Sequence, residues 1–127
     1  MKVKIKLGIL EKDTTYLTRL VTAFNKKYSD KLELYSFTDK DLAINTVNST
    51  KIDVLLASQS FEVDVEQLPK GCGFAYFVES PNVEFLHGQR AICKFQKADT
   101  IYKSILAIYS ETATNIIGSS IDDDSAA

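Results

Sequence analysis

Ile52-Asp53-Val54-Leu55-Leu56-Ala57-Ser58 is a short run that is almost continuously apolar and is closed by a small polar residue. Such a run is typical of a strand that is buried on both faces. A strand of this kind needs helices above and below it, which predicts a parallel sheet with βα crossovers. Functional residues of open α/β sheets lie just beyond the carboxyl ends of the strands, which directs attention to Ser58, Gln59 and Ser60.

The composition agrees with one domain that has a sufficient apolar core. The chain has 127 residues, 45% of them hydrophobic, and a net charge of -2. Three of its 17 acidic residues form the run Asp122-Asp123-Asp124, and without them the balance is close to +1. This charge distribution does not favour a nucleic-acid partner. Cys72 and Cys93 have no tight spacing and are interpreted as buried, reduced thiols of a cytosolic protein.

The sequence offers no segment for membrane insertion and no signal peptide. Met1 to Leu7 alternates lysines with apolar residues, which is the period of a strand rather than of a targeting segment. We therefore expect the protein to be cytoplasmic. Gly118–Ala127 is the only low-complexity segment, and we interpret residues 112–127 as a polar linker or tail after a domain of residues 1–111.

Alternation and helical spacing divide the rest of the chain into five strands and the helices between them. The strands are predicted at about Val3–Leu10, Leu32–Phe37, Ile52–Ser58, Gly73–Val78 and Arg90–Lys94. A helix capped by Asp13 or Thr14 is predicted to run to Tyr28, and a second helix is predicted to follow a cap at Thr38. A short helix is predicted over Asn82–Leu86 after Ser80-Pro81, and a last helix, capped by Asp99, is predicted to run to Tyr109. Residues 61–68 stand where a helix is expected, but their period is nearer two, so they remain unassigned.

This alternation predicts an α/β, flavodoxin-like (CheY-like) three-layer sandwich. The predicted sheet has five parallel strands in the order 2-1-3-4-5. Right-handed crossovers then place the first and last helices on the same face.

The chain resembles the receiver domain of bacterial response regulators. The resemblance rests on the acidic residues that follow the first strand, on the Asp-Val-Leu-Leu run that begins at Asp53, and on Lys94-Phe95 before the last helix. A receiver holds magnesium with two acids after strand one and accepts phosphate on an aspartate at the end of strand three. A hydroxyl after strand four and a lysine after strand five bind the phosphoryl oxygens.

The resemblance implies a degenerate phosphorylation pocket. Glu11 matches the first acid, whereas Lys12 occupies the position of the second. Ser58 stands at the acceptor position, or Ala57 if the register slips by one, and neither forms an acyl phosphate. Ser80 supplies the hydroxyl only if the end of strand four is shifted. We expect the retained lysine, Lys94, to pair with Glu11 or Asp13.

We therefore interpret the chain as a pseudo-receiver, without enzymatic activity, metal or cofactor. It resembles the N-terminal receiver of the Tad (Flp) pilus assembly ATPases of the TadZ/CpaE type, which implies polar localisation and a covalently linked P-loop ATPase downstream. No G-x-x-x-x-G-K-[ST] motif occurs in this sequence. His87 has no Cys or carboxylate at ligand spacing and is interpreted as a surface residue.

Two other functions remain open at this stage. One is a phosphorylation-dependent receiver with a non-standard acceptor, which predicts magnesium-dependent labelling by a phosphodonor. The other is a flavodoxin-like cofactor-binding protein, although the chain has no Trp and no glycine-rich phosphate loop.

Exposed aromatic residues predict a protein interface. We expect a homodimer through the face formed by residues 81–87, 90–94 and 99–109, with Phe85, Tyr102 and Tyr109 as its aromatic contacts.

Overall fold

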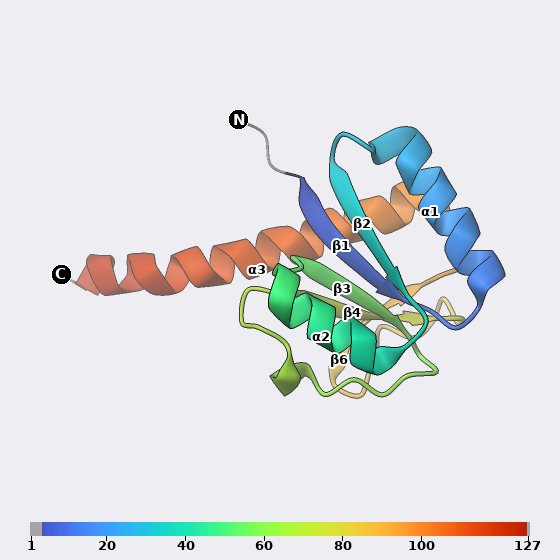
Figure 1. Ribbon diagram of the computed structural model, residues 1–127. Coiled ribbons are helices and arrows are strands. Elements are labelled where there is room, and N and C mark those ends of the chain that lie inside the picture. The colour runs from blue at the N-terminus through green and yellow to red at the C-terminus, as the bar shows by residue number, and fades with distance from the viewer. Residues whose placement is uncertain (1–3, 127) are drawn as a thin grey trace.

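The computed structural model describes residues 4–126, and describes side chains for residues 4–112 (Figure 1). Its strands are β1 (Ile5–Leu10), β2 (Leu32–Phe37), β3 (Val54–Ser58), β4 (Gly73–Val78), β5 (Phe85–Leu86) and β6 (Gln89–Cys93). Its helices are α1 (Thr14–Tyr28), α2 (Lys40–Thr50), the short 3-10 helix η1 (Val65–Gln67) and α3 (Ala98–Ala126). Val3, the predicted start of the first strand, lies outside the described residues.

The sheet has the strand order β2-β1-β3-β4-β6-β5, and only β5 is antiparallel to its neighbour. Its five parallel strands confirm the predicted order 2-1-3-4-5, with β6 as the fifth. All five residues of β3 are buried, as the apolar run Ile52–Ser58 predicted. The register aligns Leu10 with Ala57, Ser58 with Phe77 and Val78 with Cys93. The carboxyl ends of these strands therefore form one edge of the sheet.

The two faces of the sheet are covered differently. One core cluster joins β1, β3 and β4 to Leu17, Leu20 and Phe24 of α1 and to Ile101, Ile105 and Ile108 of α3. This confirms that the first and last helices share a face. The opposite face packs against α2 and against the loop residues near Val63. In Figure 1, α2 lies in front of the sheet and α3 passes behind it.

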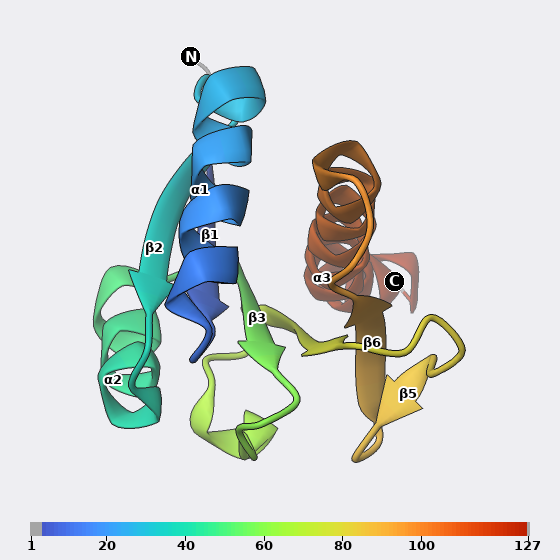
Figure 2. The same cartoon turned by 90° about the vertical axis from the view of Figure 1, so that its right-hand side faces the viewer.

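The predicted short helix at Asn82–Leu86 is wrong, because a β-hairpin takes its place (Figure 2). Phe85 pairs with Arg90 and Leu86 with Gln89, around a two-residue turn of His87 and Gly88. Both turn residues have positive φ, 52° and 78°, which is the conformation that tight hairpins with the strand twist require. The Ser80-Pro81 helix signal is therefore overridden by the His-Gly turn.

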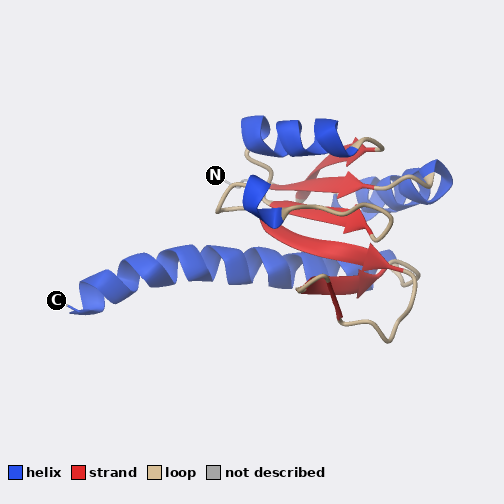
Figure 3. Cartoon of the chain, turned by 90° about the horizontal axis from the view of Figure 1, so that it is seen from below, coloured by secondary structure: helices blue, strands red, loops and turns tan. Residues whose placement is uncertain are grey.

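Residues 61–68 form an extended loop with the single turn η1, rather than a helix (Figure 3). Side chains from neighbouring elements hold this loop in place. Val63 N donates to the buried Tyr76 hydroxyl at 3.0 Å, and Lys40 Nζ donates to the Glu62 carbonyl at 3.1 Å. Asn48 Nδ2 donates to the Gln67 carbonyl at 3.0 Å. The connection from β3 to β4 thus crosses the sheet without an α-helix.

The predicted helix caps are confirmed once and corrected twice. Asp13 caps α1 by accepting a hydrogen bond from Tyr16 N. The cap of α2 is Asp39, which accepts from Leu42 N, and not Thr38. Asp99 does not cap the last helix, because α3 already begins at Ala98. Its carboxylate accepts bonds from Lys27 Nζ and the Tyr28 hydroxyl instead.

Helix α3 continues past the predicted domain end at residue 111 and runs to Ala126. Figures 1 and 3 show its second half extending beyond the sheet. The side chains of residues 113–127 lie outside the described part, so the predicted linker or tail stays a prediction. Among the described residues, no helix is both long enough and apolar enough to cross a membrane.

Candidate functional site

A buried ion pair lies at the carboxyl edge of the sheet. Lys94 Nζ is 2.7 Å from Glu11 Oε1, and the two side chains are only 5% and 3% exposed. Glu11 directly follows β1 and Lys94 directly follows β6. These two strands are separated by β3 and β4 in the sheet, so the pair closes the edge across two strands. The predicted pairing of Lys94 with Glu11 or Asp13 is confirmed, with Glu11 as the partner.

Both oxygens of the Glu11 carboxylate have partners. Oε1 binds Lys94 Nζ, while Oε2 accepts a hydrogen bond from Asp13 N at 3.0 Å. Asp13 is also the N-cap of α1, so the first turn of this helix and the ion pair are connected. The counterion and the backbone donor together offset the cost of removing this carboxylate from water.

Aromatic rings surround the Lys94 ammonium group. Its Nζ lies 4.6 Å from the ring centroid of Tyr16 and 5.5 Å from that of Phe95. The Tyr16 hydroxyl donates to the Lys94 carbonyl at 2.7 Å, so Tyr16 contacts both the backbone and the ammonium group of Lys94. Burial, assisted by the nearby Glu11 carboxylate, raises the pKa of Tyr16, which keeps this hydroxyl a donor. Tyr16 was not predicted as part of this site, because nothing in the helical spacing of α1 marks it as a neighbour of Lys94.

Lys12 does not enter this cluster. It is exposed, and its Nζ lies 5.3 Å from the ring centroid of Phe61, the residue at the start of the β3–β4 loop. The position at which a receiver carries its second acid is thus occupied by a cation held over an aromatic ring. The role of Phe61 was not predicted.

The two serines of the predicted pocket are also engaged locally. Ser58, at the end of β3, is 4% exposed, and its Oγ lies 3.0 Å from Ser60 Oγ and accepts from Ser60 N at 3.3 Å. Ser80 Oγ accepts from Asn82 N at 3.3 Å within its own turn. Neither serine has a contact with Lys94 among the described hydrogen bonds. The structure therefore joins Glu11, Asp13 and Lys94 and leaves Lys12, Ser58 and Ser80 outside that cluster.

These residues do not fit the magnesium ion of a phosphorylating receiver. Its remaining acid, Glu11, uses one oxygen for an ammonium group and the other for a backbone N–H. Lys12 places a positive charge where a second ligand is needed, and β3 ends on an alcohol instead of a carboxylate. The arrangement is a closed structural cluster rather than an open metal site.

The three aromatic residues predicted for an interface lie in different surroundings. Phe85 on β5 is 70% exposed, and Tyr109 on α3 is 39% exposed. Arg90, the partner of Phe85 in the hairpin, binds Glu111 of α3, which brings the hairpin and this part of α3 together. Tyr102 instead stacks on Tyr28 of α1, with ring centroids 3.8 Å apart. Tyr109 lies two helical turns after Tyr102 on the same side of α3, whereas Glu111 faces the hairpin, so the expectation that the two tyrosines share a face with Phe85 is wrong.

A family model described as "TadZ-like, receiver domain" matches residues 3–110. This range contains every described strand and the whole carboxyl-edge cluster. No curated protein matches the chain.

Solved receiver structures share the fold at low sequence identity. The signal receiver domain of NarL from Mycobacterium tuberculosis superposes with a TM-score of 0.68 at 13% identity, over 86% of this chain and 98% of that one. A receiver-modulated diguanylate cyclase from Pelobacter carbinolicus gives 0.65 at 13% identity, over 89% and 97%. RcsB from Salmonella enterica serovar Typhimurium, solved bound to promoter rprA with the phosphomimetic BeF3−, gives 0.61 at 11% identity, over 93% and 69%. At such identities the likeness concerns the fold alone.

Proposed function

The chain belongs to the TadZ-like receiver domain family, and we propose that it acts as a protein-interaction and localisation module that does not depend on phosphorylation. In this proposal it is the N-terminal domain of a cytoplasmic pilus-assembly ATPase, and it has no enzymatic activity of its own. The P-loop ATPase follows downstream in the same polypeptide, and the module directs it to its site in the cell.

The observation that carries this proposal is the buried Lys94–Glu11 ion pair. Phosphoryl transfer to a receiver needs a metal ion beside the acceptor and a free lysine to bind the phosphoryl oxygens. Here the lysine already has a carboxylate partner at 2.7 Å, and each oxygen of that carboxylate already accepts a hydrogen bond. The cluster therefore supports a single fixed state of the strand ends rather than a switch between two states.

The hairpin and the adjoining part of α3 support a role in protein contacts. Phe85 is an exposed aromatic residue of the hairpin, and the Arg90–Glu111 ion pair holds the hairpin against α3. The half-buried Leu86 adds apolar surface on the same hairpin. Aromatic side chains of this kind are enriched at the centres of interfaces. We propose that a second copy of the chain docks on this face and forms a homodimer.

The test compares self-association with and without a phosphodonor. Sedimentation velocity of the wild type is expected to show a concentration-dependent dimer whose affinity is unchanged by acetyl phosphate and magnesium. Phe85→Glu is expected to weaken this dimer at least tenfold, because a charge must then be buried. The exposed residue Leu42 on α2 offers a matched control, since Leu42→Glu leaves the hairpin face intact. A dimer strengthened by the phosphodonor, or unaffected by Phe85→Glu, would contradict the proposal.

A further inference from the structure

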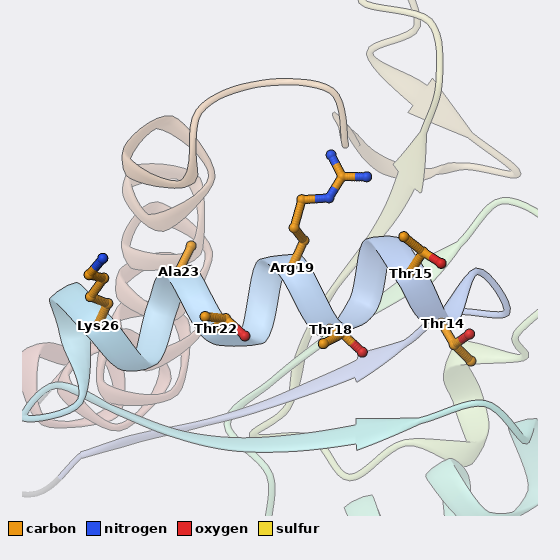
Figure 4. Close-up of a pocket in the computed structure, with 7 residues that line it drawn as sticks. All are labelled: Thr14, Thr15, Thr18, Arg19, Thr22, Ala23 and Lys26. Carbon is orange, nitrogen blue, oxygen red and sulfur yellow. The ribbon is translucent and has the colours of Figure 1, made fainter.

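Two adjoining open depressions lie along the outer side of α1, and the first of them is lined by that helix alone. The larger, of about 700 Å³, is lined by Thr14, Thr15, Thr18, Arg19, Thr22, Ala23 and Lys26. The second, of about 540 Å³, lies between α1 and the segment Phe95–Ala98 that leads into α3, and it shares Arg19 and Ala23 with the first. Figure 4 shows Arg19, Ala23 and Lys26 on one side of α1 and Thr14, Thr18 and Thr22 on the other. We call this surface the α1 groove.

The composition of α1 is not what helix stability alone favours. Four of its 15 residues are threonines that line the groove, and threonine is a poor helix former. Thr14, Thr15, Thr18 and Thr22 are all exposed, so packing of the core does not require them. The helix also contains no acidic residue, although glutamate is a common choice for an exposed helix position. Such a local departure from stable design is typical of a surface with a function.

The groove carries positive charge that the fold does not neutralise. Within the part of the chain whose side chains are described, the ion pairs are Lys27–Asp99, Arg90–Glu111 and Lys94–Glu11. Arg19, Lys26 and Lys97 line the groove and are absent from these pairs, while Asp13 is the single acid of its lining. A chain with a net charge of -2 thus concentrates cations on one surface.

Apolar side chains accompany these cations. Phe95 is 64% exposed at the rim of the groove, and Leu20 and Ala98 contribute to its lining. A fitting ligand therefore combines carboxylates with at least one apolar group. The sequence contains one run of three consecutive acids, Asp122-Asp123-Asp124, and Ile121 directly precedes it.

We propose that the segment Ile121–Asp124 of a second copy of this chain docks in the α1 groove. Its run of three acids complements the positive charge of Arg19, Lys26 and Lys97. The groove of the same copy is out of reach, because α3 starts beside the groove at Ala98 and runs away from it to Ala126 (Figure 1). At 1.5 Å per residue, Asp122 lies about 36 Å along the helix from Ala98.

This contact joins different surfaces of two copies, so it differs from the proposed hairpin dimer. A head-to-tail contact leaves one free groove and one free acidic segment at the ends of each assembly, so that further copies can add. The ion pairs lie at the surface and are screened by salt, with a Debye length of about 8 Å at physiological ionic strength. The association is therefore expected to be weak and strongest at low salt.

The test uses Phe85→Glu as the parent, so that the hairpin dimer cannot contribute. A groove variant adds Arg19→Glu and Lys97→Glu, and a tail variant adds Asp122→Lys and Asp123→Lys. Lys70→Glu, at an exposed lysine outside the groove, serves as the charge control. Circular dichroism checks that each variant is folded. If Phe85→Glu does not fold, the same substitutions are made in Phe85→Ser.

In sedimentation velocity at low salt, the parent and the Lys70 control are expected to form species larger than a dimer as concentration rises. The groove and tail variants are each expected to associate about tenfold more weakly or not at all, because like charges then meet. Mixed together, they are expected to form a 1:1 pair and nothing larger, since one contributes an intact tail and the other an intact groove. A monomeric parent, or a mixture that associates no better than its components, would overturn the proposal while leaving the hairpin dimer untouched.

Discussion

Lys94 Nζ and Glu11 Oε1 lie 2.7 Å apart at the carboxyl edge of the sheet, with both side chains almost completely removed from solvent. The two residues are 83 positions apart in the sequence and belong to strands that are not neighbours. Lys94, which matches the lysine that binds phosphoryl oxygens in a phosphorylating receiver, is here bound to a buried carboxylate. The same contact that closes the pocket also connects α1 to the end of β6, through Asp13 and Tyr16.

Removal of one partner of this ion pair is expected to be costly. Glu11→Gln or Lys94→Met leaves an uncompensated buried charge or donor, and each should lower the free energy of unfolding by about 3–5 kcal/mol. The double variant should lose much less than the sum of the two, because it buries no lone charge. Urea denaturation of the four proteins measures this coupling, and additive losses would show that the pair is not coupled.

Gly73 at the start of β4 is expected to tolerate no side chain. A Cβ there would lie 2.5 Å from Ile108 Cγ2 and 2.8 Å from Thr112 Oγ1 of α3. Gly73→Ala should therefore displace α3 and cost about 1–3 kcal/mol in thermal or urea unfolding. The control is Gly8→Ala, whose Cβ would meet the mobile end of Leu55 at 3.1 Å and should cost less. Equal losses in the two variants would contradict this packing of α3 on β4.

The His87-Gly88 turn is expected to respond to residues that differ in their tolerance of positive φ. Gly88 has φ of 78° and open space around it, so Gly88→Ala meets backbone strain rather than a clash, at a cost of about 1 kcal/mol. His87→Asn should instead stabilise the hairpin by a few tenths of a kcal/mol, because asparagine favours this conformation. Opposite signs in chemical denaturation support the hairpin, whereas insensitivity at both positions contradicts it.

The contact between Tyr28 and Asp99 is expected to make the stability of the fold depend on pH in two ranges, one alkaline and one acidic. The hydrogen bond to Asp99 raises the pKa of Tyr28 to about 12. The contribution of this hydrogen bond to the stability of the fold is therefore complete below pH 10 and is lost as the pH rises through about 12. Hydrogen bonds from Lys27 and Tyr28 lower the pKa of Asp99 below its ordinary 3.8. Its stabilisation is therefore complete above that value and is lost as the pH falls through the lowered pKa.

The measurement for this contact is the ultraviolet absorbance of tyrosinate during an alkaline titration. Asp99→Asn should return one late-titrating tyrosine toward pH 10, whereas Asp30→Asn, at an exposed acid after α1, should not. An unchanged titration curve in Asp99→Asn would show that the hydrogen bond has no influence in solution.

The regular part of the fold was predictable from the sequence because its signals are local. A continuous apolar run marks β3, and the spacing of Leu17, Leu20 and Phe24 marks the buried side of α1. The strand order followed from the alternation of strands and helices. The pairing of Lys94 with Glu11 was predictable only through the resemblance to receivers, since no local pattern relates residues 83 positions apart.

The errors arose where two local signals compete or where the deciding contact is distant. Ser80-Pro81 favours a helix start, but the His87-Gly88 turn favours a hairpin and prevails. The loop near Val63 is held by the buried Tyr76 hydroxyl, and no pattern in either segment predicts this contact. Tyr102 was placed by helical position alone, and its stacking on Tyr28 depends on how α1 and α3 pack.

The most direct test of the account is phosphorylation by a small donor. The wild-type chain, incubated with acetyl phosphate and magnesium, is measured by intact mass spectrometry beside Lys12→Asp/Ser58→Asp, which restores the missing acids. The wild type is predicted to show no phosphorylated species, because Ser58 is no carboxylate and Glu11 is bound to Lys94. Glu11→Asp serves as a further control, because it changes the one receiver-type acid that the chain keeps without removing its charge. Magnesium-dependent phosphorylation of the wild type, mapped to the carboxyl edge of the sheet, would contradict the account.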